Sequence, residues 1–242
     1  MAVWGIRAVE EALASDASVQ ALYVLKGAGR RVERLASLAR GRGAKVVEVP
    51  KRVLDQYSPH HQGVVLLLSP VEFVPWQRMV AEVEGRGGVP LLLALDGVED
   101  AGNMGAVLRS AEALGVHCVV VPKRRSASIT SAVVKSSAGA LFHLAVDRVT
   151  NLSRALGEMK ERGLWVVGTH LECGEEPWKV DLTLPLVLVV GNEERGISRL
   201  VKETCDFLVR IPMEGKVGSL NVSAATAVLL YEVLRQRKGQ PL

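Results

Sequence analysis

Three glycine-containing loops hold the polar residues that could do chemistry. The first is D-G-V-E-D-A-G-N-M-G-A-V-L-R, from Asp96 to Arg109. Its glycines permit close approach of the backbone, and Asn103 is expected to cap a helix that begins there. Arg109 follows Gly105 by four residues, so its guanidinium group can extend back toward the loop over a position without a side chain. A cap followed by a surface arginine is the ordinary alternative, while a dinucleotide site is disfavoured because G-x-G-x-x-G is absent.

The second loop, L-V-L-V-V-G-N-E-E-R-G-I-S at residues 186–198, places two carboxylates directly after an apolar run. A strand is expected to end at Gly191, with Glu193 and Glu194 leading into a helix. Acidic residues in the first turn of a helix are stabilised by the helix dipole. Taken alone, this ordinary role is a sufficient explanation for both glutamates.

The third loop covers residues 210–232 and begins R-I-P-M-E-G-K-V-G-S-L-N-V-S. Ser219, Asn221 and Ser223 crowd the start of a helix that otherwise consists mostly of alanine, valine and leucine. One such residue is enough for an N-cap. We therefore expect some of these three side chains to face a ligand.

The elements that must position these loops alternate in type from residue 91 onward. This alternation predicts a parallel sheet covered by helices on both faces, and such sheets bind ligands beyond the carboxyl ends of their strands. The expected strands are 91–96, 118–122, 165–169, 186–191 and 207–211, and the expected helices are 103–114, 130–138, 151–162, 197–204 and 222–237.

The first 70 residues predict a separate, small α/β unit. Helices are expected at 7–14 and 31–40, and strands at 21–25, 45–49 and 63–68. A proline- and glycine-rich stretch around a helical segment at 76–84 follows. We therefore predict a small N-terminal domain at 1–70, a linker at 71–88 and a second domain at 89–242.

The excess positive charge lies in this first unit. The chain has a formal net charge of +4, and residues 1–70 carry ten lysines and arginines against six acidic residues. A basic patch of this kind suits a nucleic acid backbone, although a solvated helix face is the ordinary alternative. The candidate RNA-binding residues are Lys26, Arg30, Arg31, Arg34, Lys51 and Arg52, with Arg124 in the basic loop 122–128.

Composition excludes several classes of protein. Hydrophobic residues make up 48% of the chain, too many for a disordered protein, and the apolar runs are too short to span a bilayer. The charged N-terminus lacks the apolar stretch of a signal peptide. Three cysteines without a C-x-x-C motif argue against a disulfide scaffold and a zinc site. We therefore expect a cytoplasmic protein that has no metal and no membrane association.

Taken together, the loops resemble the three motifs of the SpoU (TrmH-like) branch of the SPOUT RNA methyltransferases. Motif one is similar to N-x-G-x-x-x-R at 103–109, motif two to V-G-x-E-x-x-G at 190–196, and motif three to I-P-M…S-L-N-V-S at 211–213 and 219–223. Residues 5–13 and 61–65 also resemble the N-terminal substrate domain of the RlmB-type ribosomal RNA ribose methyltransferases. One departure is Asn192, where alanine is commoner, and the spacing identifies Glu193 rather than Glu194 as the motif glutamate.

The resemblance implies an α/β protein whose parallel-sheet catalytic domain ends in a deep trefoil knot, preceded by a ribosomal-protein-like substrate domain. It implies S-adenosylmethionine as the cofactor and a homodimer in which both subunits build the RNA site and helix 222–237 forms part of the interface. The implied cofactor-binding residues are Thr169, Gly191, Ile211, Leu220 and Asn221.

The implied reaction is methyl transfer to a ribose 2′-hydroxyl, by resemblance that of a guanosine in large-subunit (23S) ribosomal RNA. The resemblance makes Arg109 the candidate general base, a role that a guanidinium group could take only if its pKa were strongly perturbed. The alternative that we favour is that Arg109 binds the substrate phosphate and stabilises the developing alkoxide. Asn103 would position the ribose or Arg109, and Glu193 would orient Arg109 or the substrate. Ser219 would hydrogen-bond near the reacting hydroxyl, and Asn221 would fix the loop near the methyl donor.

Three alternatives stay open at this point. The same chemistry could act on tRNA, although many tRNA-modifying members of the family lack a separate N-terminal domain. A non-catalytic RNA-binding assembly factor could keep the fold, but the intact motif residues argue against it. A nucleotide-dependent oxidoreductase is disfavoured by the missing glycine fingerprint and by the basic N-terminal patch.

Overall fold

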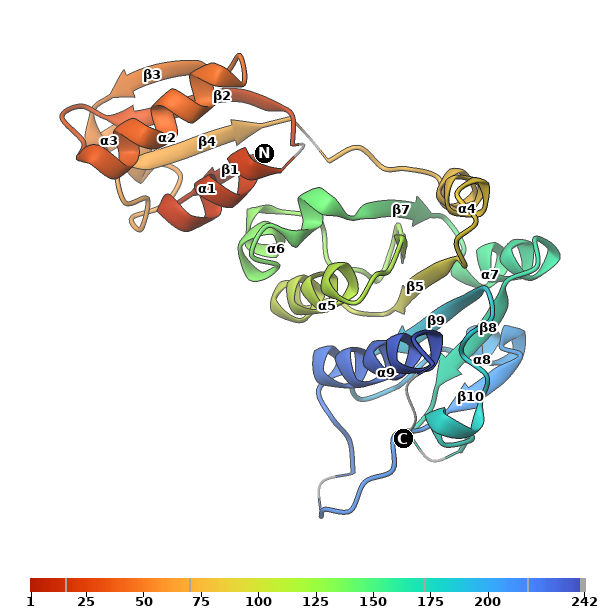
Figure 1. Ribbon diagram of the computed structural model, residues 1–242. Coiled ribbons are helices and arrows are strands. Elements are labelled where there is room, and N and C mark those ends of the chain that lie inside the picture. The colour runs from red at the N-terminus through yellow and green to blue at the C-terminus, as the bar shows by residue number, and fades with distance from the viewer. Residues whose placement is uncertain (16, 70, 172, 217, 240–242) are drawn as a thin grey trace.

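The computed structural model describes residues 1–15, 17–69, 71–171, 173–216 and 218–239. Two β-sheets, each packed against helices, form the two parts of the molecule (Figure 1). The smaller sheet lies near the N-terminus, and the larger one is built by residues from Leu91 onward. No described helix is long and apolar enough to cross a membrane.

The smaller sheet has four strands in the order β1-β4-β2-β3, in which β2 and β3 are parallel and β4 is antiparallel to both β1 and β2. Helix α2 is amphipathic: Val32, Leu35 and Ala39 are buried, while its arginines lie on the opposite, exposed face. The elements are β1 (Ala2–Trp4), α1 (Ile6–Ala14), β2 (Val19–Leu25), α2 (Arg30–Gly41), β3 (Lys45–Val49), α3 (Lys51–Asp55) and β4 (Val64–Leu68). The five predicted elements are present, and the sequence patterns missed only the short β1 and α3.

The larger sheet has six parallel strands in the order β10-β8-β9-β5-β6-β7. Its strands are β5 (Leu91–Asp96), β6 (Cys118–Pro122), β7 (Ala145–Val149), β8 (Trp165–Thr169), β9 (Leu186–Gly191) and β10 (Phe207–Val209). Its helices are α4 (Trp76–Gly85), α5 (Ala101–Ala113), α6 (Ser131–Ser136), η1 (Ala140–His143), α7 (Leu152–Glu161), η2 (Pro177–Lys179), α8 (Arg199–Thr204) and α9 (Val222–Arg237). The predicted parallel α/β sheet is confirmed, although β7 was not foreseen.

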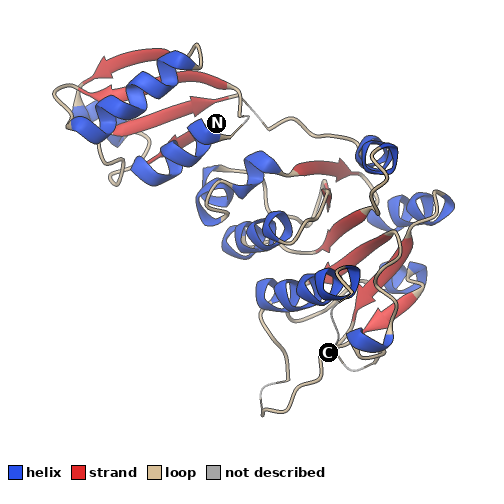
Figure 2. Cartoon of the chain, in the orientation of Figure 1, coloured by secondary structure: helices blue, strands red, loops and turns tan. Residues whose placement is uncertain are grey.

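Helices cover both faces of this sheet (Figure 2). Alternate residues of β5 divide between two cores: Leu93 packs with α5, α6 and α9, and Leu92 packs with α4, α7 and α8. Such two-sided burial is the reason why its strands are continuous apolar runs. Helix α4 belongs to the second layer, where Trp76 is only 2% exposed. Helix α4 is therefore part of the core of the large sheet, although it lies in the segment predicted as a linker. The domain division at 70 and 89 stays a prediction.

The first helix after β5 begins earlier than predicted. Asp100 is its N-cap, and the Asp100 carboxylate accepts a hydrogen bond from the Asn103 backbone N–H at 2.7 Å. The prediction that Asn103 caps the helix is therefore wrong. Aspartate is as good a cap as asparagine, and the earlier start places Asn103 inside the first turn with its side chain free for another contact.

The strand order places the motif loops together. β5 and β9 are neighbours, so the loops that follow Asp96 and Gly191 begin side by side at the carboxyl edge of the sheet. Helix α9 then packs against α5 and β9, which returns the third motif to the same edge. In parallel sheets, ligands bind at the carboxyl edge between two neighbouring strands whose outgoing connections lead to opposite sides of the sheet. The implied trefoil knot stays a prediction.

Candidate active site

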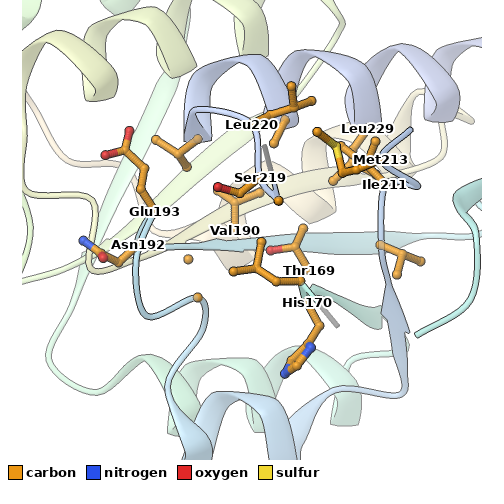
Figure 3. Close-up of a pocket in the computed structure, with 17 residues that line it drawn as sticks. Thr169, His170, Val190, Asn192, Glu193, Ile211, Met213, Ser219, Leu220 and Leu229 are labelled. Carbon is orange, nitrogen blue, oxygen red and sulfur yellow. The ribbon is translucent and has the colours of Figure 1, made fainter. Parts of the chain in front are cut away.

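A pocket opens at the carboxyl ends of β8 and β9, beside the beginning of α9. The space among its lining residues, together with the solvent at its open mouth, is about 650 Å³. Asn192 and Glu193 lie at one end, and Ile211 and Met213 lie at the other (Figure 3). The lining residues are Thr169, His170, Leu171, Val190, Gly191, Asn192, Glu193, Gly196, Val209, Ile211, Met213, Gly218, Ser219, Leu220, Val222, Ala225 and Leu229.

The loop after β9 folds back tightly on the strand that precedes it. A Cβ atom at Gly191 would lie 2.1 Å from the carbonyl carbon of Gly196, so only glycine permits this turn. The Asn192 side chain braces the loop: its Oδ1 accepts the N–H groups of Glu194 and Arg195, and its Nδ2 donates to the carbonyl oxygen of Gly97 at 3.2 Å. Helix α8 begins only at Arg199, so the ordinary role of the glutamates as first-turn acids is wrong.

Glu193 joins the three motifs through a hydrogen-bonded network. Its Oε1 accepts the Nδ2–H groups of Asn103 and of Asn221, each at 2.6 Å. Asn221 Nδ2 also lies 3.0 Å from Asn103 Oδ1 and donates to it. Residues 118 positions apart are thus held by one carboxylate, and such charge-assisted bonds are short and strong. The network fixes the first and third loops around the second.

The third loop divides its polar residues between capping and the pocket. Asn221 is the N-cap of α9, and its Oδ1 accepts from the N–H and the hydroxyl group of Ser223 at 2.9 and 2.6 Å. Ser219 lines the pocket beside Leu220 (Figure 3). Of the three polar residues, Ser219 therefore faces a possible ligand, while Asn221 both caps α9 and bonds to Glu193.

Arg109 does not lean back over Gly105 as predicted. The space above Gly105 is taken by α6, because a Cβ atom there would lie 1.9 Å from Ser136 Oγ and 2.7 Å from Ser137 N. Arg109 is exposed, does not line the pocket, and forms no side-chain hydrogen bond or ion pair with the described residues. Gly105 is explained by helix packing, and Arg109 remains available to an incoming anion.

The electrostatics of the pocket favour a cation. Among the lining residues that the structure describes, Glu193 supplies the one carboxylate and there is no lysine or arginine. Two thiols outside the pocket are poor nucleophiles near neutral pH, since burial raises the pKa of Cys205 to about 11 and that of Cys118 to about 12. The described residues contain no group of three or more histidine, cysteine, aspartate or glutamate side chains that could hold a metal ion.

Comparison with known families identifies both parts of the molecule. A model described as the SpoU rRNA Methylase family matches residues 90–231, and one described as RNA 2'-O ribose methyltransferase substrate binding matches residues 2–74. The chain belongs to the SpoU rRNA methylase family. The predicted class, an RNA 2′-O-ribose methyltransferase with an N-terminal substrate-binding domain, is thereby confirmed.

Full-length relatives support this assignment. RlmB of Pseudomonas aeruginosa, a 23S rRNA (guanosine-2'-O-)-methyltransferase, is 46% identical over 239 residues, which cover 97% of this SpoU methylase and 96% of RlmB. YacO of Bacillus subtilis, whose name places it in the TrmH family and leaves tRNA or rRNA open, is 43% identical over 237 residues, which cover 97% and 95%. The crystal structure of the SpoU methyltransferase AviRb from Streptomyces viridochromogenes in complex with AdoMet has a TM-score of 0.81 and 27% identity, over 99% of this chain and 91% of that one.

The predicted site residues of this SpoU methylase fall into three groups. Thr169, Gly191, Ile211 and Leu220, predicted to bind the cofactor, all line the pocket, whereas Asn221 lies beside it and contacts Glu193. Asn103 is joined to this network, and Arg109 is not. The predicted RNA-binding residues Lys26, Arg30, Arg31, Arg34, Lys51, Arg52 and Arg124 are all exposed.

Sequence reasoning missed several lining residues. His170 follows the predicted Thr169 directly, and Val209 lies two residues before the predicted Ile211. Met213 ends the I-P-M part of motif three, but no role was assigned to it. Ala225 and Leu229 come from the first turns of α9, and only the packing of that helix against β9 brings them to the pocket.

Proposed function

We propose that this SpoU methylase transfers the methyl group of S-adenosylmethionine to a ribose 2′-hydroxyl, by relationship that of a guanosine in large-subunit ribosomal RNA. The observation that carries the proposal is the Asn103–Glu193–Asn221 network at the rim of an apolar pocket. It joins all three family motifs at one edge of the sheet. The relatives are bacterial, so the bacterial cytoplasm, where ribosomes are assembled, is the expected place of action.

The residues of the pocket fit S-adenosylmethionine. Val190, Ile211 and Leu220 offer apolar surface for an adenine ring, and the hydroxyl groups of Thr169 and Ser219 can bond to polar atoms. Glu193 is the charged lining residue that suits a sulfonium cation. When bound, the cofactor supplies an activated methyl group. The AviRb complex with AdoMet supports this assignment.

The residues around the pocket have distinct roles in this proposal. Glu193 holds Asn103 and Asn221 in place, so the amides of both loops are preorganised before RNA arrives. Ser219 hydrogen-bonds near the reacting hydroxyl group. Arg109 binds the substrate phosphate and stabilises negative charge on the attacking oxygen, in agreement with its exposure and its free guanidinium group.

The N-terminal unit supports ribosomal RNA as the substrate class. Its exposed cations surround the start of α2 and follow β3, so a phosphate backbone could bind there with release of counterions. The side chains of Arg30, Arg31 and Arg34 form no hydrogen bond or ion pair with the described residues, which leaves them available. RlmB of P. aeruginosa, which is related over both domains, is named for 23S rRNA.

We also propose a homodimer that uses the outer face of α9. Val228 and Tyr231 are 46% and 58% exposed there, and Ala224 lies on the same stripe at helical spacing. Apolar residues of this size on one face are a common feature of protein interfaces. Light scattering of the purified protein would give a single-chain mass if this proposal is wrong.

The test is methyl transfer from labelled S-adenosylmethionine to protein-free ribosomal RNA and to bulk tRNA in parallel. Label in one ribose of large-subunit RNA is the expected result. Label in tRNA alone would keep the chemistry and overturn the substrate assignment. Binding of the cofactor without transfer to either RNA, or to a late assembly intermediate, would favour a non-catalytic RNA-binding protein.

A further inference from the structure

A second group of cations lies on the catalytic domain, away from the N-terminal patch. Residues 123–126, here called the basic turn, follow β6 at the carboxyl edge of the large sheet. Lys123, Arg124 and Arg125 are all exposed, and none of their side chains forms a hydrogen bond or an ion pair with the described residues. Three adjacent cations without a counter-charge repel one another, and an anionic ligand would relieve that repulsion.

The basic turn is held at both of its ends. The Lys123 N–H donates to the carbonyl oxygen of Val149 at 2.8 Å, which extends the pairing of β6 with β7. On the other side, the Ala127 N–H donates to the carbonyl oxygen of Val98 at 3.0 Å. A turn fixed in this way presents its charges without a further cost of ordering the backbone, which favours tight binding.

The basic turn and the pocket share a support. Val98 directly follows Gly97, whose carbonyl oxygen accepts the Asn192 side chain from the pocket loop at 3.2 Å. The two residues after β5 are therefore bonded to the pocket loop on one side and to the basic turn on the other. The pocket loop follows β9 and the basic turn follows β6, with β5 as the strand between them, so both lie at the carboxyl edge of the same part of the sheet.

The backbone of the basic turn is strained. Arg125 has a φ of +58°, in the left-handed region that residues other than glycine rarely adopt. The Oγ atom of the next residue, Ser126, is buried without a hydrogen-bond partner among the described residues. Strained backbone and unsatisfied polar atoms are concentrated where a structure serves binding rather than stability.

We propose that the basic turn is a phosphate clamp that binds the RNA strand flanking the reacting ribose. It would act on phosphodiester oxygens without reading the base, because its three free side chains are cations. This inference rests on the proposed function, since it assumes RNA as the substrate. The clamp would set the register of the strand at the pocket, while the N-terminal patch grips RNA farther away.

The test compares variants of the full-length protein for binding of protein-free large-subunit ribosomal RNA. The basic turn is neutralised by Lys123→Ala, Arg124→Ala and Arg125→Gly together, and glycine at 125 keeps the left-handed backbone without strain. The matched control is Arg86→Ala, an exposed arginine between α4 and β5 at the opposite, amino-terminal edge of the sheet. RNA affinity is measured at several salt concentrations, with cofactor affinity and melting temperature measured alongside.

We expect the triple variant to bind RNA at least about tenfold more weakly, with a salt slope reduced by about 2. Its melting temperature should not fall below that of the wild type, because the substitutions relieve charge repulsion and backbone strain, and its cofactor affinity should be unchanged. A purely structural turn would instead lower the melting temperature. Unchanged RNA affinity and salt slope would overturn the clamp, and so would an equal loss in Arg86→Ala. If the wild type binds RNA but transfers no methyl group, the proposed function fails while the binding comparison still tests the clamp.

Discussion

The bonds from Glu193 to Asn103 and Asn221 predict that these residues contribute to activity as one unit. Both bonds are 2.6 Å long and end on the same carboxylate oxygen. Removing the carboxylate by Glu193→Ala breaks both bonds and leaves only the bond from Asn221 to Asn103. Removing Asn103 breaks one of the two bonds to Glu193 and also the bond from Asn221. The effects of two residues that share a bond are not additive, so a double-mutant cycle can measure the shared part.

The size of the effect follows from the geometry. A hydrogen bond to a charged group contributes about 1.5–3 kcal/mol, and the lower end applies here because Glu193 and Asn221 are exposed. We therefore expect Glu193→Ala to lower kcat/KM by roughly 30- to 150-fold, equivalent to about 2–3 kcal/mol over two bonds. Asn103→Ala should cost about tenfold, and the double variant should retain about tenfold more activity than the product of the single effects.

The assay is methyl transfer at several RNA concentrations, with cofactor affinity measured by calorimetry. Glu194→Ala is the matched control, because the neighbouring glutamate is exposed and its side chain bonds to no described residue; we expect less than about a twofold change. Glu193→Gln keeps an acceptor and loses the charge, so its activity should lie between wild type and Glu193→Ala. Multiplicative single effects, or an equal loss in Glu194→Ala, would refute the network.

Three further predictions test other parts of the structure. Gly191→Ala should abolish cofactor binding and lower the melting temperature, since its Cβ atom would lie 2.1 Å from the Gly196 backbone; a variant that binds normally by calorimetry would show that the loop is not needed in this form. Arg109→Ala should abolish methyl transfer and leave the cofactor dissociation constant unchanged, and loss of cofactor affinity would mean that Arg109 acts at the pocket. Thiol titration at pH 8 should detect exposed Cys173 alone until the protein is unfolded. The pKa of Cys205 is raised from 9.0 to about 11, so the folded state keeps a proton that the unfolded state loses. The free energy of unfolding should therefore decrease as pH rises from about 9 to 11, and should do so less in Cys205→Ser.

The strands of the large sheet were predictable where they are buried on both faces. β5, β6, β8 and β9 match their expected bounds, because each is an apolar run that ends at a proline, a glycine or a polar residue. β7 was missed because its sequence A-V-D-R-V is that of an edge strand with two charged residues. A short edge strand buries little apolar surface, and its pattern is too weak to separate from a loop.

The residues of the candidate site could be predicted from the sequence, but most of the contacts between them could not. Each motif residue can be found from its spacing, but contacts over 90 or more positions depend on how α5 and α9 return to β9. Periodicity gives no information about that return. The role of Asn192 is similar: its bond to Gly97 exists only because β9 and β5 are neighbours in the sheet.

In motif one, reasoning from local sequence assigned the wrong role to two residues. Asn103 looked like a cap and Gly105 like space for an arginine, but Asp100 takes the cap and α6 takes the space. Because the Asp100 side chain caps the helix, the side-chain amide of Asn103 is not needed as a cap and can donate to Glu193. Because Gly105 lets α6 approach, the Ser136 hydroxyl can donate to the Ala101 carbonyl oxygen at 2.9 Å and brace the same turn. The first turn of α5 is thus held by Glu193 through Asn103 and by α6 through Gly105, and a preorganised site requires such support.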